Sequence, residues 1–425
     1  MAGLQSPFRR EMPANRGNPR RGIPVLVITL FAAFVLKTAI AYLTYGTNDI
    51  TTFQLDLSKV QAKGAVALYR EGVQFTSPAG LLWPLQVFSH PPSMIHVLEF
   101  WGMLAALTHL PLQFWMRFTC ALADAGSVWV VWRMGNELPA LRILPSTLIA
   151  LAACPATILI SGFHGNTDPI MIFLVLVSVY LIEARRAPVM AGIFMGLALS
   201  VKVVPAILIP AALLYLPGWN ARLRFACFAG AVVFATGLPL TATDPGLILR
   251  SIAGYSGLPS VWMRLSGVLG VSLAANKALY FAALFLFSIG MNRSRPRFPL
   301  FAQCGLLITF TLFCAPGFAV QYLAWAVPWV TCLGLPAAAT FYAAAGSFLF
   351  VTYNYWSGGL PWYAAYAIDM SPPALIFEVF CWCVLGVTLL KFLKSSHDES
   401  PPNDRKHRGY KDTPISVSCK ARHAG

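Results

Sequence analysis

Charged side chains are scarce in this sequence: Asp, Glu, Lys and Arg make up 11% of its 425 residues, whereas a typical soluble domain has about 25%. A long internal polar stretch is lacking too, which excludes a sizeable soluble domain. Long apolar runs recur instead between Ile23 and Leu393, and 57% of the residues are hydrophobic. Such runs are typical of a polytopic membrane protein. We predict an all-α fold, because helices satisfy their own backbone hydrogen bonds in lipid and the alternating pattern of membrane strands is missing.

Cysteine pairs with the spacing of a redox motif or a zinc site are also missing. The nine cysteines are scattered, and most lie inside apolar runs, where cysteine behaves as a small hydrophobic residue. Cys381 and Cys383 are two residues apart, which suits neither a helix face nor a redox motif. We therefore predict no disulfide, no metal site and no cofactor. A divalent metal is left as an option that no motif indicates.

Acidic residues are few: 16 Asp and Glu stand against 31 Lys and Arg, for a net charge of +15. A basic chain can bind nucleic acid, but here the positions favour another interpretation. The basic residues flank the apolar region and fill short loops inside it, as cytoplasmic loops of membrane proteins do. We predict no nucleic-acid partner. These residues are Arg9, Arg10, Arg16, Arg20, Arg21, Arg133, Arg142, Arg185, Arg186, Arg222, Arg224, Arg293, Arg295, Arg297, Arg405, Lys406, Arg408, Lys411, Lys420 and Arg422.

The charge pattern also predicts the topology. With a cytoplasmic N-terminus, the first span runs from Ile23 to Tyr45, and an outer loop follows at residues 46–116. The segment Ser93–Trp115 could either cross the membrane or lie on its surface. A crossing would turn four basic loops outward, so we predict a surface helix. The chain then crosses about twelve times. The other predicted spans are Arg117–Trp132, Leu144–Gly162, Pro169–Ile182, Val189–Val201, Val203–Leu216, Phe225–Leu240, Lys277–Met291, Pro299–Ala315, Gln321–Leu333, Pro336–Tyr355 and Pro372–Leu393.

Three parts follow from this topology. Residues 1–22 form a basic cytoplasmic tail, residues 23–393 form the transmembrane domain, and residues 394–425 form a polar cytoplasmic tail that we predict to be disordered. Most polar residues inside the domain then collect at its outer face, which indicates a single outward-facing site. They are Asp49, Asp56, residues 161–169, Lys202, Gln321 and Tyr322.

The polar stretch SGFHGNTDP, residues 161–169, lies between two apolar runs. Its histidine, amide and carboxylate (His164, Asn166 and Asp168) together suit hydrogen bonding to a sugar or a phosphate. Asp168 precedes Pro169, so it could instead be the N-cap of the next helix. His164 and Asn166 have no such capping role, which favours a functional role for them.

Lys202 lies in the apolar stretch AGIFMGLALSVKVVPAILIP, which Pro205 and Pro210 interrupt. A lysine in such surroundings is costly in lipid and suggests function. Two short helices meeting at Lys202 would place its ammonium at the outer interface, where it could bind a phosphate. The alternative is a lysine that merely reaches to the membrane surface.

The outer loop carries further candidates. Asp49 directly follows the first span, where a carboxylate could act as a general base or be an ordinary helix-end residue. Asp56, Tyr69 and His90 lie farther along this loop, whose length is unusual unless it is functional, and we keep them as candidates for substrate binding.

The stretch FCAPGFAVQYLAW, residues 313–325, contains Gln321, Tyr322 and Trp325. Aromatic residues near a membrane interface are usually anchors. They also stack on sugar rings, so we keep Gln321 and Tyr322 as candidates for substrate binding.

The order of these motifs resembles a known family. An outer Asp after the first span is followed by MRFTCALADAGSVWVVW with Arg117 and Asp124, then by CPATILISGFHGNTDPIMIFLVL, AGIFMGLALSVKVVPAILIP and FCAPGFAVQYLAW. This order is similar to that of the GT-C superfamily of integral-membrane glycosyltransferases, over roughly Thr47 to Trp329. Dolichyl-phosphate-glucose-dependent glucosyltransferases, GPI mannosyltransferases and bacterial multi-pass enzymes look similar in these segments.

The resemblance implies that a sugar is transferred with inversion from a polyprenyl phosphate at the non-cytoplasmic face. By the same resemblance, Asp49 is the catalytic base and Lys202 lies near the donor phosphate. His164, Asn166, Asp168 and Arg117 are implied to be donor-binding. Some relatives carry a paired acidic motif in this loop, whereas here Asn48 precedes Asp49 and the next acid is Asp56. That departure weakens the case for a metal and leaves Asp56 as an alternative base.

We therefore predict a glycosyltransferase that moves a hexose, mannose or glucose, to a lipid-linked or glycan acceptor. The alternative is a transporter or a flippase for lipid-linked sugars, which broken helices and intramembrane charges also mark. It would show inverted repeats and polar residues near the membrane midplane, and the sequence has no clear repeat. We expect a bacterial inner membrane, with the endoplasmic reticulum membrane as the alternative.

Overall fold

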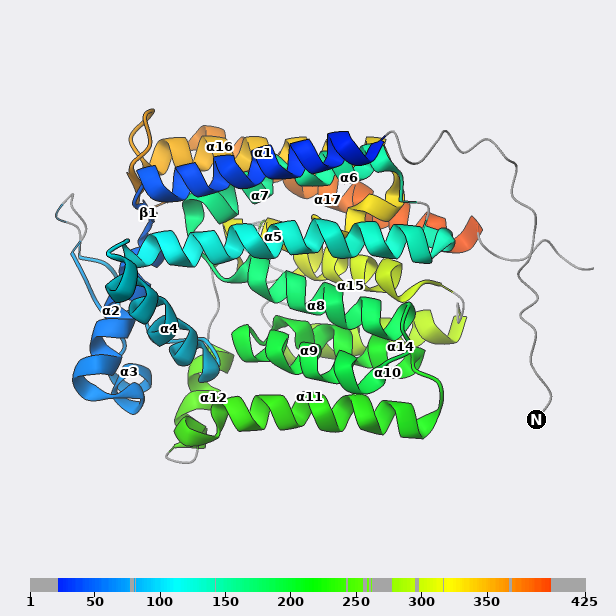
Figure 1. Ribbon diagram of the computed structural model, residues 1–425, viewed down its shortest axis with the longest axis horizontal. Coiled ribbons are helices and arrows are strands. Elements are labelled where there is room, and N and C mark those ends of the chain that lie inside the picture. The colour runs from blue at the N-terminus through cyan, green and yellow to red at the C-terminus, as the bar shows by residue number, and fades with distance from the viewer. Residues whose placement is uncertain are drawn as a thin grey trace, which may run out of the picture.

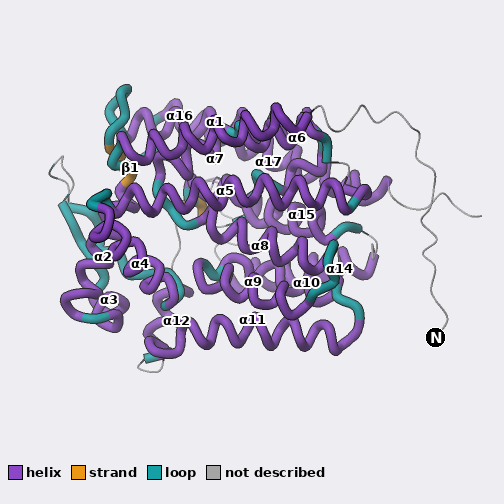
Figure 2. Tube along the Cα trace, viewed as in Figure 1, coloured by secondary structure: helices purple, strands orange, loops and turns teal. Residues whose placement is uncertain are grey.

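The computed structural model describes residues 22–398 except 77–79, 81, 142, 242–243, 255–257, 260, 262–276, 295–297, 316 and 367–368. Most of this part of the chain is helical (Figure 2), which confirms the all-α prediction. The two tails, predicted at residues 1–22 and 394–425, lie almost wholly outside the described residues, although α17 continues to Asp398.

The helices vary widely in length, and many begin at a proline, whose fixed φ and missing N–H suit the first turn of a helix. They are α1 (Gly22–Leu43), α2 (Asn48–Lys63), α3 (Ala65–Glu71), α4 (Ser93–Thr108), α5 (Leu112–Glu137), α6 (Pro145–Ala152), α7 (Pro155–Leu159), α8 (Asp168–Glu183), α9 (Pro188–Val201), α10 (Ile209–Tyr215), α11 (Gly218–Thr241), α12 (Pro245–Gly254), α14 (Lys277–Ser294), α15 (Leu300–Cys314), α16 (Leu335–Trp356) and α17 (Pro372–Asp398).

In the described part of the chain, short 3₁₀ and π segments and four two-residue strands connect these helices. The 3₁₀ segments are η2 (Pro139–Leu141), η4 (Val204–Leu208), η6 (Val320–Trp325) and η7 (Trp329–Leu333), and η3 (Ile160–His164) is a π-helical turn. The strands β1 (Gly46–Thr47) and β4 (Ala364–Ala365) pair in parallel, and β2 (Leu258–Pro259) and β3 (Gly317–Phe318) pair antiparallel.

The long helices run side by side as a bundle, and α2, α3 and α4 cover one end of it (Figure 1). We call α2, α3, α4 and the described residues between them the cap. The start of α1 and the end of α17 lie at the opposite end of the bundle (Figure 1). This arrangement agrees with the predicted topology, in which both tails share one face and the outer loop lies at the other.

The cap has a hydrophobic core of its own, separate from the large core of the bundle. Ile50, Phe53, Leu68, Met94 and Trp101 are all buried in it. The predicted outer loop is therefore largely a folded layer of helices with buried apolar residues.

The predicted surface helix Ser93–Trp115 is wrong as a single element. The chain breaks at His109, which has a left-handed φ of 59°, and Pro111 cannot continue a helix because it lacks an N–H. As a result α4 ends at Thr108, α5 begins at Leu112, and the two helices are bent by 114°. This bend is the geometry expected if α5 crosses the membrane and α4 lies along its surface.

The predicted span Gln321–Leu333 is also wrong, because the two 3₁₀ segments η6 and η7 occupy it. Their residues are largely buried in the protein, where irregular backbone is tolerated at membrane depth. Likewise, the predicted span Val203–Leu216 begins as the 3₁₀ segment η4 and continues as α10.

Four helices of the described chain are long and apolar enough to cross a membrane alone, and the bent pair α4–α5 would make a fifth crossing. Several other apolar helices are shorter, among them α9 and α15. The protein is thus multi-pass, and the number of about twelve crossings stays a prediction.

Close packing of α9 against α11 uses small residues. A Cβ atom on Gly192 would lie 2.4 Å from the carbonyl oxygen of Phe225, and one on Gly196 would lie 2.7 Å from that of Ala229. The spacing of these glycines is the small-xxx-small pattern of membrane helix pairs.

One polar cluster lies away from the capped end of the bundle, which the sequence did not lead us to expect. Lys37 of α1 is buried and forms an ion pair with Asp124 of α5, with Nζ 2.6 Å from Oδ2. Ser161 of η3 donates a hydrogen bond to the same oxygen, also at 2.6 Å. The pair therefore ties two long helices to the turn that carries His164.

Candidate functional site

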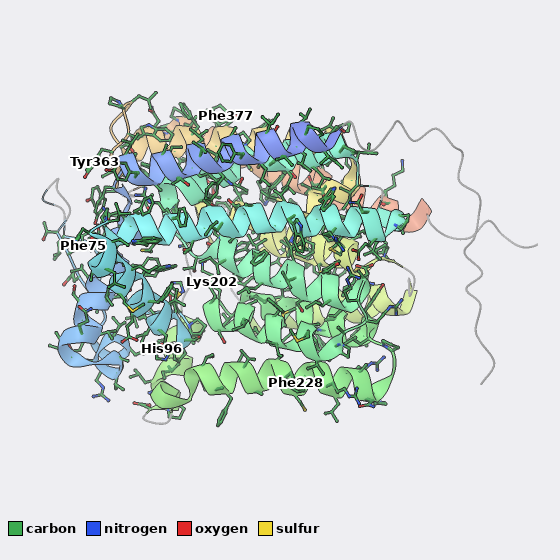
Figure 3. The ribbon with its side chains drawn as sticks, viewed as in Figure 1. Phe75, His96, Lys202, Phe228, Tyr363 and Phe377 are labelled. Atoms are coloured by element: carbon green, nitrogen blue, oxygen red, sulfur yellow. The ribbon has the colours of Figure 1, made fainter. Side chains whose placement is uncertain are left out.

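A cavity of about 940 Å³, including its opening to solvent, lies where the cap meets the bundle. Lys202, labelled in Figure 3, marks the capped end of the bundle where this cavity lies. Residues from the cap, from the loop before α8, from the segment between α9 and η4, and from η4, η6 and α12 form its wall. They are Asn48, Asp49, Thr52, Phe53, Asp56, Gln86, Val87, Phe88, Ser89, His90, Pro91, Asn166, Lys202, Val203, Val204, Ile252, Gln321, Tyr322 and Trp325.

Asp49 lies in the first turn of α2, and the backbone before it is fixed from two sides. Strand β1 pairs with β4, and the hydroxyl of Thr47 donates a hydrogen bond to the carbonyl oxygen of His164 at 2.7 Å. The start of α2 is thereby held beside the π-turn η3. Single π-turns inside helical segments are frequent at functional sites.

The carboxylate of Asp49 receives two hydrogen bonds from the predicted HGNTD cluster. Its Oδ2 lies 2.7 Å from Nδ2 of Asn166 and 3.2 Å from Nε2 of His164. Burial raises the pKa of Asp49, but the hydrogen bond and charge of His164, the bond from Asn166 and the charge of Lys202 outweigh it. The net result is a pKa below the usual value of an aspartate, so this group is ionised at neutral pH.

Lys202 lies between α9 and η4 in an extended conformation, with φ −148° and ψ 149°. Two short helices therefore do meet at this residue. Its ammonium donates to Oδ1 of Asn166 at 2.9 Å and to Oδ1 of Asp168 at 2.8 Å. These partners and a side-chain exposure of only 11% argue against a lysine that merely reaches to the membrane surface.

Asn166 links the two charged groups that the sequence singled out. Its amide nitrogen donates to Asp49, and its amide oxygen accepts from Lys202. The carboxylate and the ammonium therefore line one cavity and are separated by a single side chain.

Asp168 is not the N-cap of α8, so that alternative is wrong. Thr167 holds the N-cap position, and Asp168 is the first residue of the helix. The fully buried carboxylate accepts hydrogen bonds from Lys202 and, at 2.7 Å, from Nε1 of Trp325. Asp168 is not in the cavity wall itself, so it orients the ammonium of Lys202 from the side away from the cavity.

Arg117 is completely buried and lies outside the cavity wall, although the resemblance implies a donor-binding role for it. Its guanidinium donates to the carbonyl oxygens of Ala41 and Thr44 and to that of Phe163. Arg117 therefore joins the end of α1 to the π-turn, and its contacts are those of a positioning residue.

Tyr69 is likewise buried behind the wall. Its hydroxyl donates to the carbonyl oxygen of His90 at 2.6 Å, so it fixes the segment that brings His90 into the cavity. Burial, followed by the charge of Lys202, lowers the pKa of His90 to about 3. His90 is therefore neutral at physiological pH and can both donate and accept a hydrogen bond.

Gln321 and Tyr322 both line the cavity, as the sequence suggested. The ring of Tyr322 stacks on that of Trp325, with centroids 4.1 Å apart. The Lys202 ammonium lies 5.7 Å from the centroid of the Tyr322 ring. This aromatic pair forms an apolar wall next to the cation.

Two residues of the site were missed by sequence reasoning. Trp325 was interpreted only as an interfacial aromatic, yet it bonds Asp168 and lines the cavity. Tyr353 of α16 lies within 2.9 Å of Nδ1 of His164, on the side of the ring opposite Asp49. A tyrosine inside an apolar helix carries no sequence signal for such a role, whereas Trp325 lies next to the predicted pair.

Among the residues that the structure describes, no group of three or more His, Cys, Asp or Glu side chains is placed to hold a metal ion. The cavity wall brings together the ionised carboxylate of Asp49, the neutral imidazole of His90 and the ammonium of Lys202.

Comparisons with known proteins agree with the resemblance drawn from the motifs. Residues 88–249 match the model of glycosyltransferase family 87. The polyprenol-phosphate-mannose-dependent alpha-(1-2)-phosphatidylinositol mannoside mannosyltransferase of Mycobacterium tuberculosis is 28% identical over 209 residues. That alignment covers 46% of this chain and 48% of the relative, so the chain spans about half the length of the relative.

Among solved structures, ArnT from Cupriavidus metallidurans in the apo state is similar with a TM-score of 0.47 and 14% identity, over 88% of this chain and 76% of that one. The family match and the mannosyltransferase relative confirm the resemblance to GT-C glycosyltransferases that the order of motifs predicts. The matched range contains His90, Arg117, His164, Asn166 and Lys202, and it leaves Asp49 and Asp56 outside.

Proposed function

We propose that this protein is an inverting glycosyltransferase that moves a hexose from a polyprenyl phosphate to a hydroxyl group of a lipid-linked or glycan acceptor. The observation that carries the proposal is the cavity in which Asn166 bridges the ionised Asp49 and the ammonium of Lys202. Mannose is the first candidate for the sugar, because the mannosyltransferase relative uses a polyprenol-phosphate-mannose donor by its name.

The chemistry requires a base for the incoming hydroxyl and a positive charge for the departing phosphate. In this proposal the acceptor oxygen attacks the anomeric carbon while its proton passes to Oδ1 or Oδ2 of Asp49. The bond between the anomeric carbon and the phosphate oxygen breaks, and polyprenyl phosphate leaves with the electron pair. The two groups act from opposite sides of the anomeric carbon, so its configuration inverts.

Each neighbour of these two groups has a definite task. The Nε2–H of His164 and the amide of Asn166 keep Asp49 ionised and oriented, and Asp168 and Trp325 hold Lys202 in place. The capped end lies opposite the start of α1 (Figure 1), so the reaction takes place at the non-cytoplasmic face in the predicted topology. In a bacterium that face belongs to the inner membrane.

The test is sugar transfer by the purified full-length protein from radiolabelled polyprenyl-phosphate mannose and polyprenyl-phosphate glucose. Asp49→Asn should lower turnover by about 10²- to 10⁴-fold, because a positioned general base contributes that much. Asp369→Asn is the matched control, since this exposed aspartate bonds Tyr355 outside the cavity. Retention of configuration in the product, or full turnover by Asp49→Asn, would contradict the proposed mechanism.

A further inference from the structure

Asp56 lies on the same face of α2 as Asp49, and both line the cavity. Thr52 and Phe53 lie between them on this face, which gives the i, i+3, i+4, i+7 spacing of one side of a helix. Seven residues of helix separate the two carboxyl groups by about 10 Å along the axis. The cavity therefore has a second acidic position, away from the cluster around Lys202.

The carboxyl of Asp56 is buried, with 2% of the residue exposed, and its Oδ1 has no hydrogen-bond partner among the described residues. Buried polar groups in native proteins are nearly always paired, and an exception calls for an explanation. A partner that arrives with the substrate would supply that explanation at a position in a cavity wall.

Lys59, one turn along α2, does not neutralise Asp56 by contact. Its ammonium donates to the carbonyl oxygen of Gly72 at 2.5 Å and lies 3.0 Å from the carboxylate of Glu71. Burial raises the pKa of Asp56 to about 8, and the charge of Lys59 offsets only part of that rise. The group is thus a neutral carboxylic acid at pH 7, which offers one O–H donor and one carbonyl acceptor.

A neutral carboxylic acid matches a hydroxyl group, which also donates and accepts, and it gives an anion no charge to bind. Phe53 and Phe88 also line the cavity, and each of their rings lies 5.4 Å from the ring of His90, so the wall is partly aromatic. The phosphate of the donor belongs instead beside Lys202, whose ammonium lies in the wall.

We propose that this end of the cavity is the acceptor subsite, and that the carboxyl of Asp56 hydrogen-bonds a second hydroxyl of a ring polyol, such as a sugar, while Asp49 faces the attacking hydroxyl. The proposal rests on the proposed function, since it names where the acceptor of that reaction is held. It assigns to Asp56 recognition of the acceptor and no proton transfer.

The test uses the full-length protein with polyprenyl-phosphate mannose as donor and octyl α-mannoside as acceptor probe. Asp56→Asn keeps a donor and an acceptor in a neutral group, so its KM for the acceptor should rise by a smaller factor than that of Asp56→Leu. Asp56→Leu has similar bulk and no hydrogen bonds, so its acceptor KM should rise at least tenfold while its donor KM stays unchanged. Asp56→Ala, which also lacks side-chain hydrogen bonds, replaces the leucine variant if that variant does not fold.

Two results would overturn the assignment. A loss of kcat of a hundredfold in Asp56→Asn at unchanged acceptor KM would make Asp56 the base. An acceptor KM equal to wild type in Asp56→Leu would show that the carboxyl does not bind the acceptor.

A binding measurement separates this assignment from the proposed function. If wild type transfers no mannose, the proposed function is at fault, and calorimetry of octyl α-mannoside with Asp49→Asn and with Asp49→Asn/Asp56→Leu decides the subsite. At least tenfold weaker binding by the double variant would support the Asp56 subsite, and equal binding or no binding by both would overturn it.

Discussion

Replacement of Asp56 by asparagine should stabilise the protein by an amount that grows with pH. Burial raises the pKa of Asp56 from 3.8 to about 8. Between these two values the unfolded chain has released the proton and the folded protein still holds it. Folding must then take up a proton from a solution in which protons become scarcer, so the stability of the wild type falls as pH rises through this window.

The size of the effect follows from the same window. Each pH unit inside it lowers the free energy of unfolding of the wild type by about 1.4 kcal/mol, and Asp56→Asn removes this dependence because the amide does not titrate. Between pH 5 and pH 7 the stability difference between variant and wild type should grow by about 2.7 kcal/mol. For a chain of this size that corresponds to about 3 °C in the midpoint of thermal unfolding.

The assay is thermal unfolding of both proteins in one detergent at pH 5 and at pH 7. Because the comparison is a difference of differences, other titrating groups cancel. A difference between variant and wild type that is the same at both pH values would refute the neutral, buried state of Asp56. A difference that shrinks with pH would require an ionised Asp56 with a stabilising partner.

Three other outcomes follow from the packing and from the hydrogen bonds of the site. Lys37→Met should lower stability by about 3–5 kcal/mol, because it removes the counter-charge of the largely buried carboxylate of Asp124, which keeps the hydrogen bond from Ser161. A second change, Asp124→Leu, should recover most of this loss in thermal unfolding. Gly192→Ala should destabilise by about 1–3 kcal/mol, since its Cβ would lie 2.4 Å from a carbonyl oxygen of α11, whereas Gly230→Ala on α11 has open space and should unfold like wild type. Tyr353→Phe should lower turnover by about tenfold without changing the donor KM. It removes one hydrogen bond, of about 1.4 kcal/mol, that orients the imidazole of His164 beside Asp49. Steady-state kinetics measure both the turnover number and the donor KM.

Much of the site could be predicted because each signal was a polar or charged residue next to apolar runs. Lys202 was found from its surroundings and from Pro205 after it, and the structure does break the helix there. Asp49 and Asn166 were found from their places beside apolar runs, and they touch in the structure. Polar groups in membrane segments are few, and the need to satisfy them brings them together.

The contacts between distant segments could not be predicted in the same way. The role of Tyr353 depends on how α16 packs beside the π-turn, and neither feature has a local sequence signature. Asp168 followed a capping pattern, yet its carboxylate bonds Lys202 and Trp325 because a buried ammonium needs a counter-charge more than the helix needs a cap.

In the fold, too, features with a local sequence signal could be predicted and features that depend on packing could not. Long apolar runs predicted α1, α16 and α17 closely, because length and hydrophobicity define a span. The run at Gln321–Leu333 is buried among other helices and folds as η6 and η7. The break between α4 and α5 had a visible cause in Pro111, whose effect on one predicted helix was underestimated.

The central claim is that Asp49 and Lys202 act on opposite sides of one bound sugar. The most direct measurement compares donor affinity and turnover in Asp49→Asn and Lys202→Met, with polyprenyl-phosphate mannose as the donor. The account predicts that Asp49→Asn binds the donor as wild type does but loses turnover, and that Lys202→Met loses donor affinity by at least tenfold. Wild-type donor affinity in Lys202→Met, or wild-type turnover in Asp49→Asn, would contradict it.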